Sequence, residues 1–172
     1  MTAYEKIFLM NTLIGNSRIS LDSEEFWPAM RNQAGLVVEE TQEAFDETID
    51  ENLPNLIKEV ADVMVTAIGL FQRLQLCGVD VSEALEIVCD NNLEKFHRTA
   101  EHANETLKSH QDAGTECLVR LTTLEDGSEY YAVLRKSDGK MLKPHDFVKV
   151  SMQEIADMSQ KLSDAAKEEV GE

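Results

Sequence analysis

Two acidic clusters lie inside segments whose apolar residues recur with the period of an α-helix, and they limit what this chain can fold into more than any other feature. The first cluster is Glu39, Glu40 and Glu43, and the second is Glu59 and Asp62. Side chains three or four residues apart share one face of a helix, so each cluster gathers its carboxylates together. Because clustered acids repel one another unless a cation lies among them, the pattern predicts a divalent-metal site across two antiparallel helices.

The segment that carries the second cluster is otherwise strongly apolar. Between residues 54 and 76 the apolar positions cover more than one helical stripe, which predicts a helix at the centre of a bundle or at a subunit interface. Glu59 and Asp62 interrupt this segment, and a buried charge without compensation is costly. A partner or a metal is therefore expected there, and hard oxygen donors suit Mg²⁺, with Mn²⁺ as the alternative ion.

Periodicity and turn signals predict the other elements. Asp22 or Ser23 is expected to cap the helix that carries the first cluster, Pro54 to open the next helix and Gly78 to end it. The prediction is a mainly α fold, a helical bundle with a small C-terminal β-hairpin and a terminal helix. Residues 1–114 form the helical catalytic domain, and residues 115–172 are appended to the same domain. The expected helices are residues 3–14, 23–50, 54–76, 80–96, 99–111 and 152–168, and the expected strands are 117–121 and 130–134.

Charge and cysteine content exclude several classes of partner. The net charge of −17, from 33 acids and 16 bases, disfavours binding to nucleic-acid polymers and to anionic lipid. Free nucleotides stay compatible, because a bound cation reverses the sign of a local field. Three cysteines without a CxxC pair indicate a reducing cytoplasm, and no apolar run reaches the length that spans a bilayer. The four histidines, which show no metal-ligand spacing, receive no role: His97, His102, His110 and His145.

The acids also form part of a longer pattern. Glu39-Glu40-x-x-Glu43, fifteen intervening residues and Glu59-x-x-Asp62 resemble the EExxE…ExxD signature of the all-α nucleoside triphosphate pyrophosphohydrolases. That group includes MazG-like enzymes, dimeric dUTPases and phosphoribosyl-ATP pyrophosphohydrolases. Residues 78–80 with 92–96 resemble the GID…NMxKF stretch of phage and bacterial MazG-like proteins, and residues 137–144 resemble their SDGKVLKP tail. The resemblance covers roughly residues 30–146, and the helix from residue 151 onward departs from it.

This resemblance implies an Mg²⁺-dependent hydrolase. The reaction would cleave the α–β phosphoanhydride of a (deoxy)nucleoside triphosphate to give a monophosphate and pyrophosphate. Glu40, Glu43, Glu59 and Asp62 are the expected metal ligands. Glu39 and Glu40 are the expected catalytic acids, with Glu39 either a further ligand or the base that takes the proton of the attacking water.

The same resemblance implies substrate contacts. Asn92 and Lys95 would contact the substrate, and Lys95 would pair with a phosphate oxygen. Arg31 would reach a phosphate or brace the acids, and Lys140 and Lys143 would close over the site from the tail. The competing interpretation makes Arg31 and the two tail lysines structural or solvent-facing, and makes Lys95 a favourable charge at a helix C-terminus.

Other functions remain open from the sequence. Within the same fold, the substrate could be dUTP or phosphoribosyl-ATP. In a different class, the chain would be a non-catalytic acidic interaction protein whose terminal helix docks a partner through Ile155, Met158 and Leu162. The family commonly forms dimers or tetramers, so a homodimer or homotetramer in the cytoplasm is expected, which would be the host cytoplasm for a phage-encoded protein.

Overall fold

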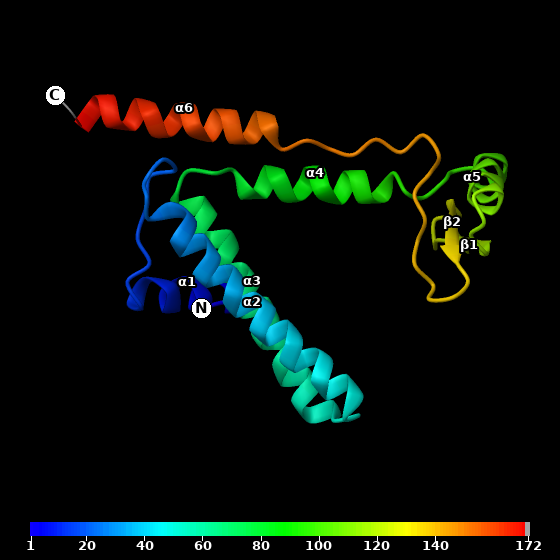
Figure 1. The fold of residues 1–172 in the computed structure, drawn as a ribbon, viewed down its shortest axis with the longest axis horizontal. Helices are drawn as coiled ribbons and strands as arrows, with labels where there is room; N and C mark the ends of the chain where they lie inside the picture. Colours follow the sequence, from blue (N-terminus) through cyan, green and yellow to red (C-terminus); the bar gives the residue numbers. More distant parts are fainter. Residues whose placement is uncertain (171–172) are drawn as a thin grey trace. The chain divides into compact units, whose positions relative to one another are not determined.

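The computed structural model describes residues 1–170, with side chains as far as Ala165. It confirms a mainly helical fold with a small antiparallel hairpin and a C-terminal helix (Figure 1). Within residues 1–170, no helix combines the length and the apolar character that crossing a bilayer requires. The elements, in chain order, are α1 (Ala3–Leu13), α2 (Phe26–Ile49), α3 (Leu53–Leu76), α4 (Val81–Leu93), α5 (Ala100–Asp112), β1 (Cys117–Thr123), β2 (Glu129–Arg135) and α6 (Gln153–Val170).

The contacts of the chain fall into two compact units. The first unit is Met1–Val81 together with the segment that begins at Met152, and the second unit is Ser82–Ser151. The first unit therefore contains α1, α2, α3 and α6, and the second contains α5, the hairpin and nearly all of α4. The contacts therefore place α5 and the hairpin in the same unit. The sequence predicts a different division, with α5 in the helical part that ends at residue 114 and the hairpin in the part that follows.

Helix α2 begins at Phe26, so the predictions of a start at residue 23 and a cap at Asp22 or Ser23 are wrong. The Ser20 hydroxyl donates to Asp22 Oδ1 at 2.5 Å, and the Glu25 amide donates to Ser23 Oγ at 3.2 Å. Such local bonds from short polar side chains stabilise turns in competition with a helix. The N-cap is Glu25, whose side chain makes no capping hydrogen bond.

Helix α3 begins and ends where its sequence predicts. The Asn52 side chain accepts a hydrogen bond from the Asn55 amide, and Pro54 lies in the first turn, where a missing N–H costs nothing. At the other end Gly78 has a φ of +90°, and the Val79 amide donates to the Leu74 carbonyl at 3.1 Å. A glycine with positive φ, followed by an amide that donates back to the last turn, is a common C-terminal cap of a helix.

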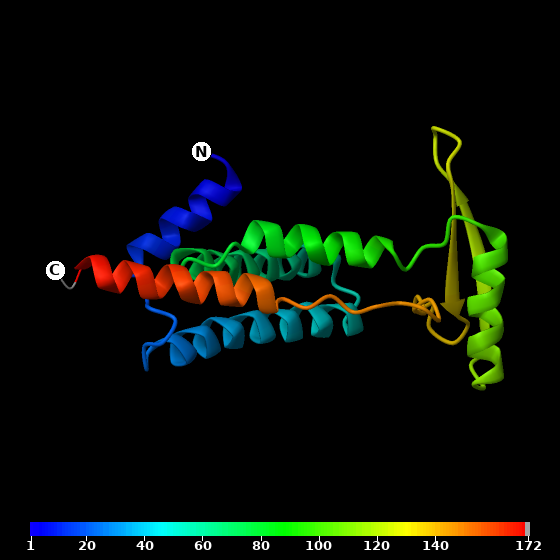
Figure 2. The same cartoon turned by 90° about the horizontal axis from the view of Figure 1, so that it is seen from above.

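The pair formed by α2 and α3 is the main structure of the first unit. Residues 50–52 connect the two helices, which lie antiparallel and side by side in both views (Figures 1 and 2). One end of the pair has an apolar core of Phe26, Met30 and Cys77, on which Ile19 and Leu21 of the preceding loop pack.

A polar network continues the interface between the helices toward the middle of the pair. The Gln33 amide donates to the Thr66 carbonyl at 3.1 Å, and its oxygen accepts from Arg73 Nε at 3.3 Å. Gln72 is almost fully buried, and its oxygen accepts from Asn11 Nδ2 at 2.7 Å. These bonds fix α1, α2 and α3 together in place of apolar packing.

The second unit is built on the hairpin. Strands β1 and β2 pair antiparallel from Cys117↔Arg135 to Thr123↔Glu129, and α5 packs along them (Figure 2). Ala103 and Thr106 of α5 and Val133 of β2 have no exposed surface. Short pairings flank β2, because His97 bridges Tyr131 and Met141 bridges Leu134.

Gly69 of α3 gives a test of the polar network. A Cβ on Gly69 would lie 2.8 Å from Gln33 Nε2, so alanine must displace a carboxamide that makes two hydrogen bonds. Losing two such bonds costs about 2 kcal/mol, against about 1 kcal/mol gained from helix propensity. We expect Gly69→Ala to lower the free energy of unfolding by about 1 kcal/mol in urea denaturation.

The effect of Gly69→Ala on the free energy of unfolding should change sign when the Gln33 carboxamide is absent. In a Gln33→Ala background, the same Gly69→Ala change should raise the free energy of unfolding by about 1 kcal/mol, because only the propensity gain remains. Equal effects in both backgrounds would contradict the assignment of this contact.

Candidate metal centre

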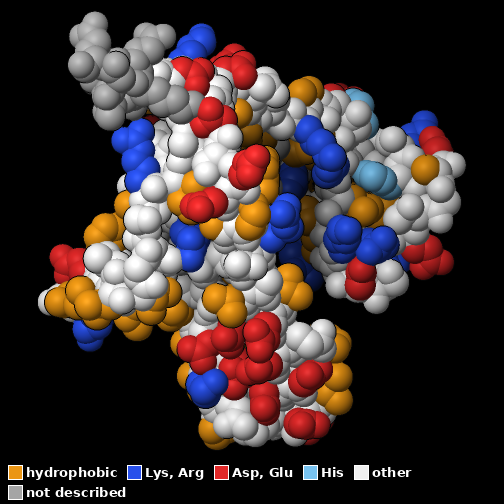
Figure 3. Space-filling model, turned by 60° about the vertical axis from the view of Figure 1, so that its left-hand side comes forward, with side chains coloured by type: hydrophobic (Ala, Val, Ile, Leu, Met, Phe, Trp, Pro, Cys, Tyr) orange, Lys and Arg blue, Asp and Glu red, His pale blue; other side chains and the backbone are white. Residues whose placement is uncertain are grey.

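Three glutamates from α2 and α3 converge near the connected end of the pair. Glu40, Glu43 and Glu59 each offer one carboxylate oxygen, and these oxygens all lie within 4.8 Å of one another. Glu40 and Glu43 share a face of α2 because they are three residues apart, and Glu59 comes from the facing helix. Figure 3 shows acidic side chains crowded on this end of the pair. The convergence across two helices is the arrangement that the sequence predicts.

Glu59 lies in the interface between the two helices. Only 7% of its surface is exposed, although the residues on either side of it, Lys58 and Val60, are exposed. On α2, the half-buried positions Val37, Glu40 and Ala44 recur at helical spacing and belong to the face toward α3. Carboxylates therefore occupy positions at which a helix pair ordinarily places apolar side chains, and they need a positive charge beside them.

Lys58 supplies one positive charge. Its ammonium lies 2.9 Å from Glu59 Oε1 and 2.9 Å from Asp62 Oδ2. These hydrogen bonds raise the pKa of Lys58, with the bond to Glu59 the larger cause. The sequence motifs predict no role for Lys58, although its i to i+4 spacing from Asp62 is the spacing of a helical ion pair.

One lysine does not neutralise the whole group. The pKa of Glu43 is raised above its ordinary value, chiefly by the negative charge of Glu59, then by burial and by Glu40, while Lys58 acts in the opposite direction. One turn further along α2, Glu47 Oε2 is buried with no hydrogen-bond partner among the described residues. Excess negative charge on hard oxygen donors is the chemistry that fits Mg²⁺ or Mn²⁺.

The other predicted residues of the first unit lie outside this group. Asp62 is one helical turn from Glu59 and forms an ion pair with Lys58. Glu39 is exposed on α2 beside Glu40. Arg31 is also exposed on α2, about 12 Å along the helix axis from Glu39 at 1.5 Å per residue. The roles predicted for these three residues stay predictions.

The other predicted substrate residues belong to the second unit, and two of them, Lys95 and Lys143, share one aromatic neighbour. Asn92 Oδ1 accepts a hydrogen bond from Lys95 Nζ. Lys95 Nζ lies 5.7 Å from the ring centroid of Phe147, and Lys143 Nζ lies 5.1 Å from it. The structure thus gathers two ammonium groups at the edge of α4 and the tail, within cation–π range of one ring.

Lys140 lies apart from that group, in the turn after β2. Its backbone amide donates to Asp138 Oδ1 at 3.1 Å, and its carbonyl accepts from the Arg135 amide at 2.8 Å. Arg135 also donates from Nε to Asp138 Oδ1 at 2.8 Å, and it lowers the pKa of Asp138 to about 2. The backbone of Lys140 therefore has a structural role, and the role predicted for its ammonium stays a prediction.

No protein-family model, curated protein or solved structure matches this chain.

The raised pKa of Glu43 predicts how pH affects the metal-free protein. A carboxyl whose pKa is higher in the folded state binds more protons when folded, so its contribution to stability decreases as pH rises through that pKa. Glutamine mimics the protonated acid. We expect Glu43→Gln to unfold at a higher urea concentration than the wild type at neutral pH in chelator, and the difference to shrink as pH falls toward 4.5, the ordinary value of this group.

Added metal should make the wild type more stable than Glu43→Gln, the reverse of their order in chelator. Added Mg²⁺ stabilises the wild type by mass action, and Glu43→Gln should gain less. Glu86→Gln, which changes an exposed acid in the middle of α4, is the control and should behave as the wild type throughout. If the wild type is more stable than Glu43→Gln in chelator, the repulsion among the glutamates is contradicted.

Proposed function

We propose that this protein is an Mg²⁺-dependent nucleotide pyrophosphohydrolase of MazG-like type, which converts a (deoxy)nucleoside triphosphate to a monophosphate and pyrophosphate. The observation that carries the proposal is the convergence of Glu40, Glu43 and Glu59 from two helices to within 4.8 Å. These glutamates belong to the EExxE…ExxD pattern, so a sequence motif and a spatial cluster coincide. Phosphoryl transfer needs charge neutralisation above all, and a cation held by these carboxylates would supply it.

Each side chain of the group then has a role. Glu40, Glu43 and Glu59 would hold the ion, which when bound offsets the charge of the triphosphate and makes a water more acidic. Lys58 now neutralises Glu59 and Asp62. With a divalent ion on Glu59, its exposed ammonium would be released toward a phosphate oxygen. Glu39, exposed beside the cluster, is the candidate to accept the proton of the attacking water.

The second unit offers groups of the kind that a nucleotide requires. Lys95 and Lys143 present two ammonium groups beside the Phe147 ring, with Asn92 bonded to one of them. Cations suit phosphate oxygens, and an aromatic face suits a base. We keep Asn92, Lys95 and Lys143 as proposed substrate contacts.

A nucleotide panel tests the reaction. The purified protein is incubated with ribo- and deoxynucleoside triphosphates, dUTP and phosphoribosyl-ATP in Mg²⁺, and the products are separated by anion exchange. We expect a monophosphate and pyrophosphate, with no turnover in chelator. Release of orthophosphate from the terminal position would contradict the proposed cleavage.

A variant set ties that activity to the cluster. We expect Glu59→Gln to lower kcat/KM by roughly 100-fold or more, because even residues that only orient a metal ligand contribute 10- to 100-fold. Glu86→Gln should retain full activity. Turnover by Glu59→Gln equal to that of the wild type would reject the site. If the wild type shows no turnover and Mg²⁺ does not change its stability, the protein is instead the non-catalytic interaction protein.

The α2–α3 pair also supports a proposal about assembly. Apolar side chains recur at helical spacing along both helices, and every one of them is at least half exposed: Val38, Phe45, Ile49, Leu53, Ile57, Val60 and Met64. Continuous apolar stripes of this length are unusual on a monomer surface. We propose that a second copy of the chain covers them, which gives a dimer or a tetramer.

Light scattering coupled to size exclusion tests this assembly. We expect a mass of two or four chains for the wild type. The double variant Ile57→Lys/Met64→Lys places charges on the α3 stripe and should shift the mass toward a monomer, because buried unpaired charges oppose association. Leu121→Lys, at an exposed apolar position of β1, is the control. A monomeric wild type would contradict the proposal.

A further inference from the structure

A second cluster of metal-binding side chains lies in the second unit, far in sequence from the acids. His102, His145 and Asp146 each offer one ligand atom, and these atoms lie within 4.8 Å of one another. His102 Nε2 is 3.8 Å from Asp146 Oδ2. The two histidines are separated by more than forty residues in sequence, which is why spacing alone gave no signal.

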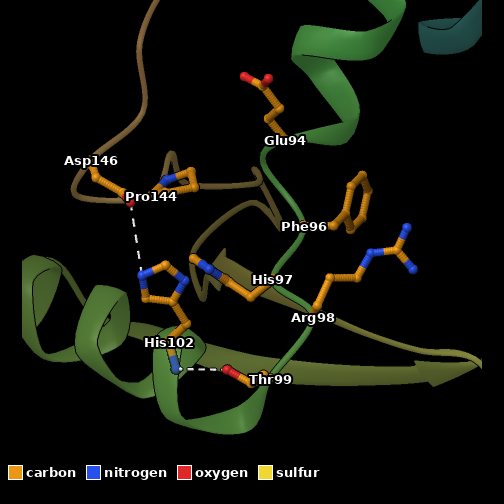
Figure 4. A pocket seen from close by; sticks show the side chains of 8 residues that line it. All are labelled: Glu94, Phe96, His97, Arg98, Thr99, His102, Pro144 and Asp146. Carbon is orange, nitrogen blue, oxygen red and sulfur yellow. Dashed lines mark hydrogen bonds and ion pairs between the residues drawn. The ribbon is translucent and has the colours of Figure 1, made fainter.

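The cluster borders a hollow of about 220 Å³. Figure 4 shows the His102 and His97 rings side by side, with the Asp146 carboxylate facing His102 across the hollow. The Thr99 hydroxyl, which caps α5, accepts a hydrogen bond from the His102 amide at 3.3 Å and so fixes the first turn of that helix. The hollow therefore opens at a well-defined helix start.

His97 provides an independent observation. It is 4% exposed, and its Nε2 is buried with no hydrogen-bond partner among the described residues. Its backbone is held on both sides, because its amide donates to the Tyr131 carbonyl at 2.8 Å and its carbonyl accepts from the Tyr131 amide at 2.9 Å. A buried ring nitrogen without a partner costs free energy, so its position beside the cluster indicates a missing ligand or water.

The surroundings of His97 favour its neutral imidazole, the form that binds metal. Burial lowers the pKa of His97, and the neighbouring His102 adds to this effect. The Thr106 hydroxyl, fully buried, lies 3.4 Å from Nδ1 of His145. A bond from Nδ1–H to that hydroxyl leaves the Nε2 lone pair of His145 for a metal, in the usual manner of a positioned ligand.

We propose that His102, His145 and Asp146 bind a first-row transition-metal ion, with Zn²⁺ the best match, and that His97 completes the site through its unpartnered Nε2. Zinc is commonly bound by two or three imidazole nitrogens together with a carboxylate oxygen, whereas Mg²⁺ prefers ligands that are all oxygen atoms. Ligand atoms around a tetrahedral zinc lie about 3.3 Å apart, so the side chains need to move by roughly 1 Å. All three primary ligands are exposed and have room for this adjustment.

An anion is the alternative occupant of the hollow, and the charges disfavour it. Arg98 also lines the hollow, but its guanidinium lies over the Tyr130 ring, 3.8 Å from the centroid, and points away from His102 (Figure 4). Glu94 and Asp146 line the same space, and Glu105 lies 3.8 Å from His102 Nε2. These carboxylates beside the imidazoles attract a cation and repel an anion.

Binding would join the tail to α5. His102 belongs to the first turn of α5, whereas His145 and Asp146 follow Pro144 in the irregular segment between β2 and α6. This segment is held near α5 by a contact of 2.9 Å between His110 Nε2 and the Lys143 carbonyl. A metal bridging the two would stabilise the second unit by mass action.

Cobalt titration tests the site, because Co²⁺ takes zinc ligands and its visible absorption reports nitrogen coordination. Chelator-treated protein is titrated with Co²⁺ in excess Mg²⁺, which saturates carboxylate sites, and is then challenged with Zn²⁺. We expect one equivalent of Co²⁺ with a visible band that Zn²⁺ abolishes. His102→Gln and His145→Gln should each weaken binding at least tenfold.

Three comparisons keep the result interpretable. Cys89→Ser removes an exposed thiol of the same unit that is outside the cluster and should bind Co²⁺ within about twofold of the wild type. Glu59→Gln should also bind normally, which separates this site from the one proposed for Mg²⁺. Because His102 is exposed, His102→Gln should keep the wild-type circular dichroism spectrum. Unchanged binding in His102→Gln and His145→Gln, or loss of binding in Glu59→Gln, would overturn the proposal.

Discussion

The mutual repulsion of carboxylates between α2 and α3 is the constraint on which the rest of this structure depends. Glu59 is buried between the helices, Glu40 and Glu43 face it, and Lys58 balances only part of the charge. A helix pair with such an interface gains less from apolar burial than an ordinary pair would. The polar network around Gln33 and Gln72 likewise takes the place of apolar packing among α1, α2 and α3.

This interface leaves several apolar side chains of α3 on the outside of the pair. Polar residues of α3 such as Glu59 and Thr66 lie toward α2, while Ile57, Val60 and Met64 are exposed. Stability must then come from elsewhere, because a lone helix pair buries little apolar area. A bound cation and a second chain are the two proposed sources, and each acts on a different face of α3.

The two proposed metal sites differ in the ligands they use. The site in the first unit has three carboxylates and suits a hard ion that keeps water and phosphate in its shell. The cluster in the second unit has imidazoles and suits zinc, which takes few ligands and holds them firmly. One chain could therefore keep a catalytic ion exchangeable and a structural ion in place, since the two ions compete poorly for each other's ligands.

The sequence alone determined the mainly helical fold, the ends of α3 and the hairpin, because Pro54, Gly78 and the period of apolar residues act locally. It also predicted that Glu40, Glu43 and Glu59 meet, since i to i+3 spacing and a short connection between helices fix their faces, although the predicted Glu39 and Asp62 lie outside that group. Tertiary structure decided the rest. The start of α2 is an exception, because the bonds at Ser20 and Ser23 that compete with the helix are local ones. The partners of Lys58 and the meeting of His102 with His145 depended on side-chain placement and on contacts between distant segments, which no local pattern encodes.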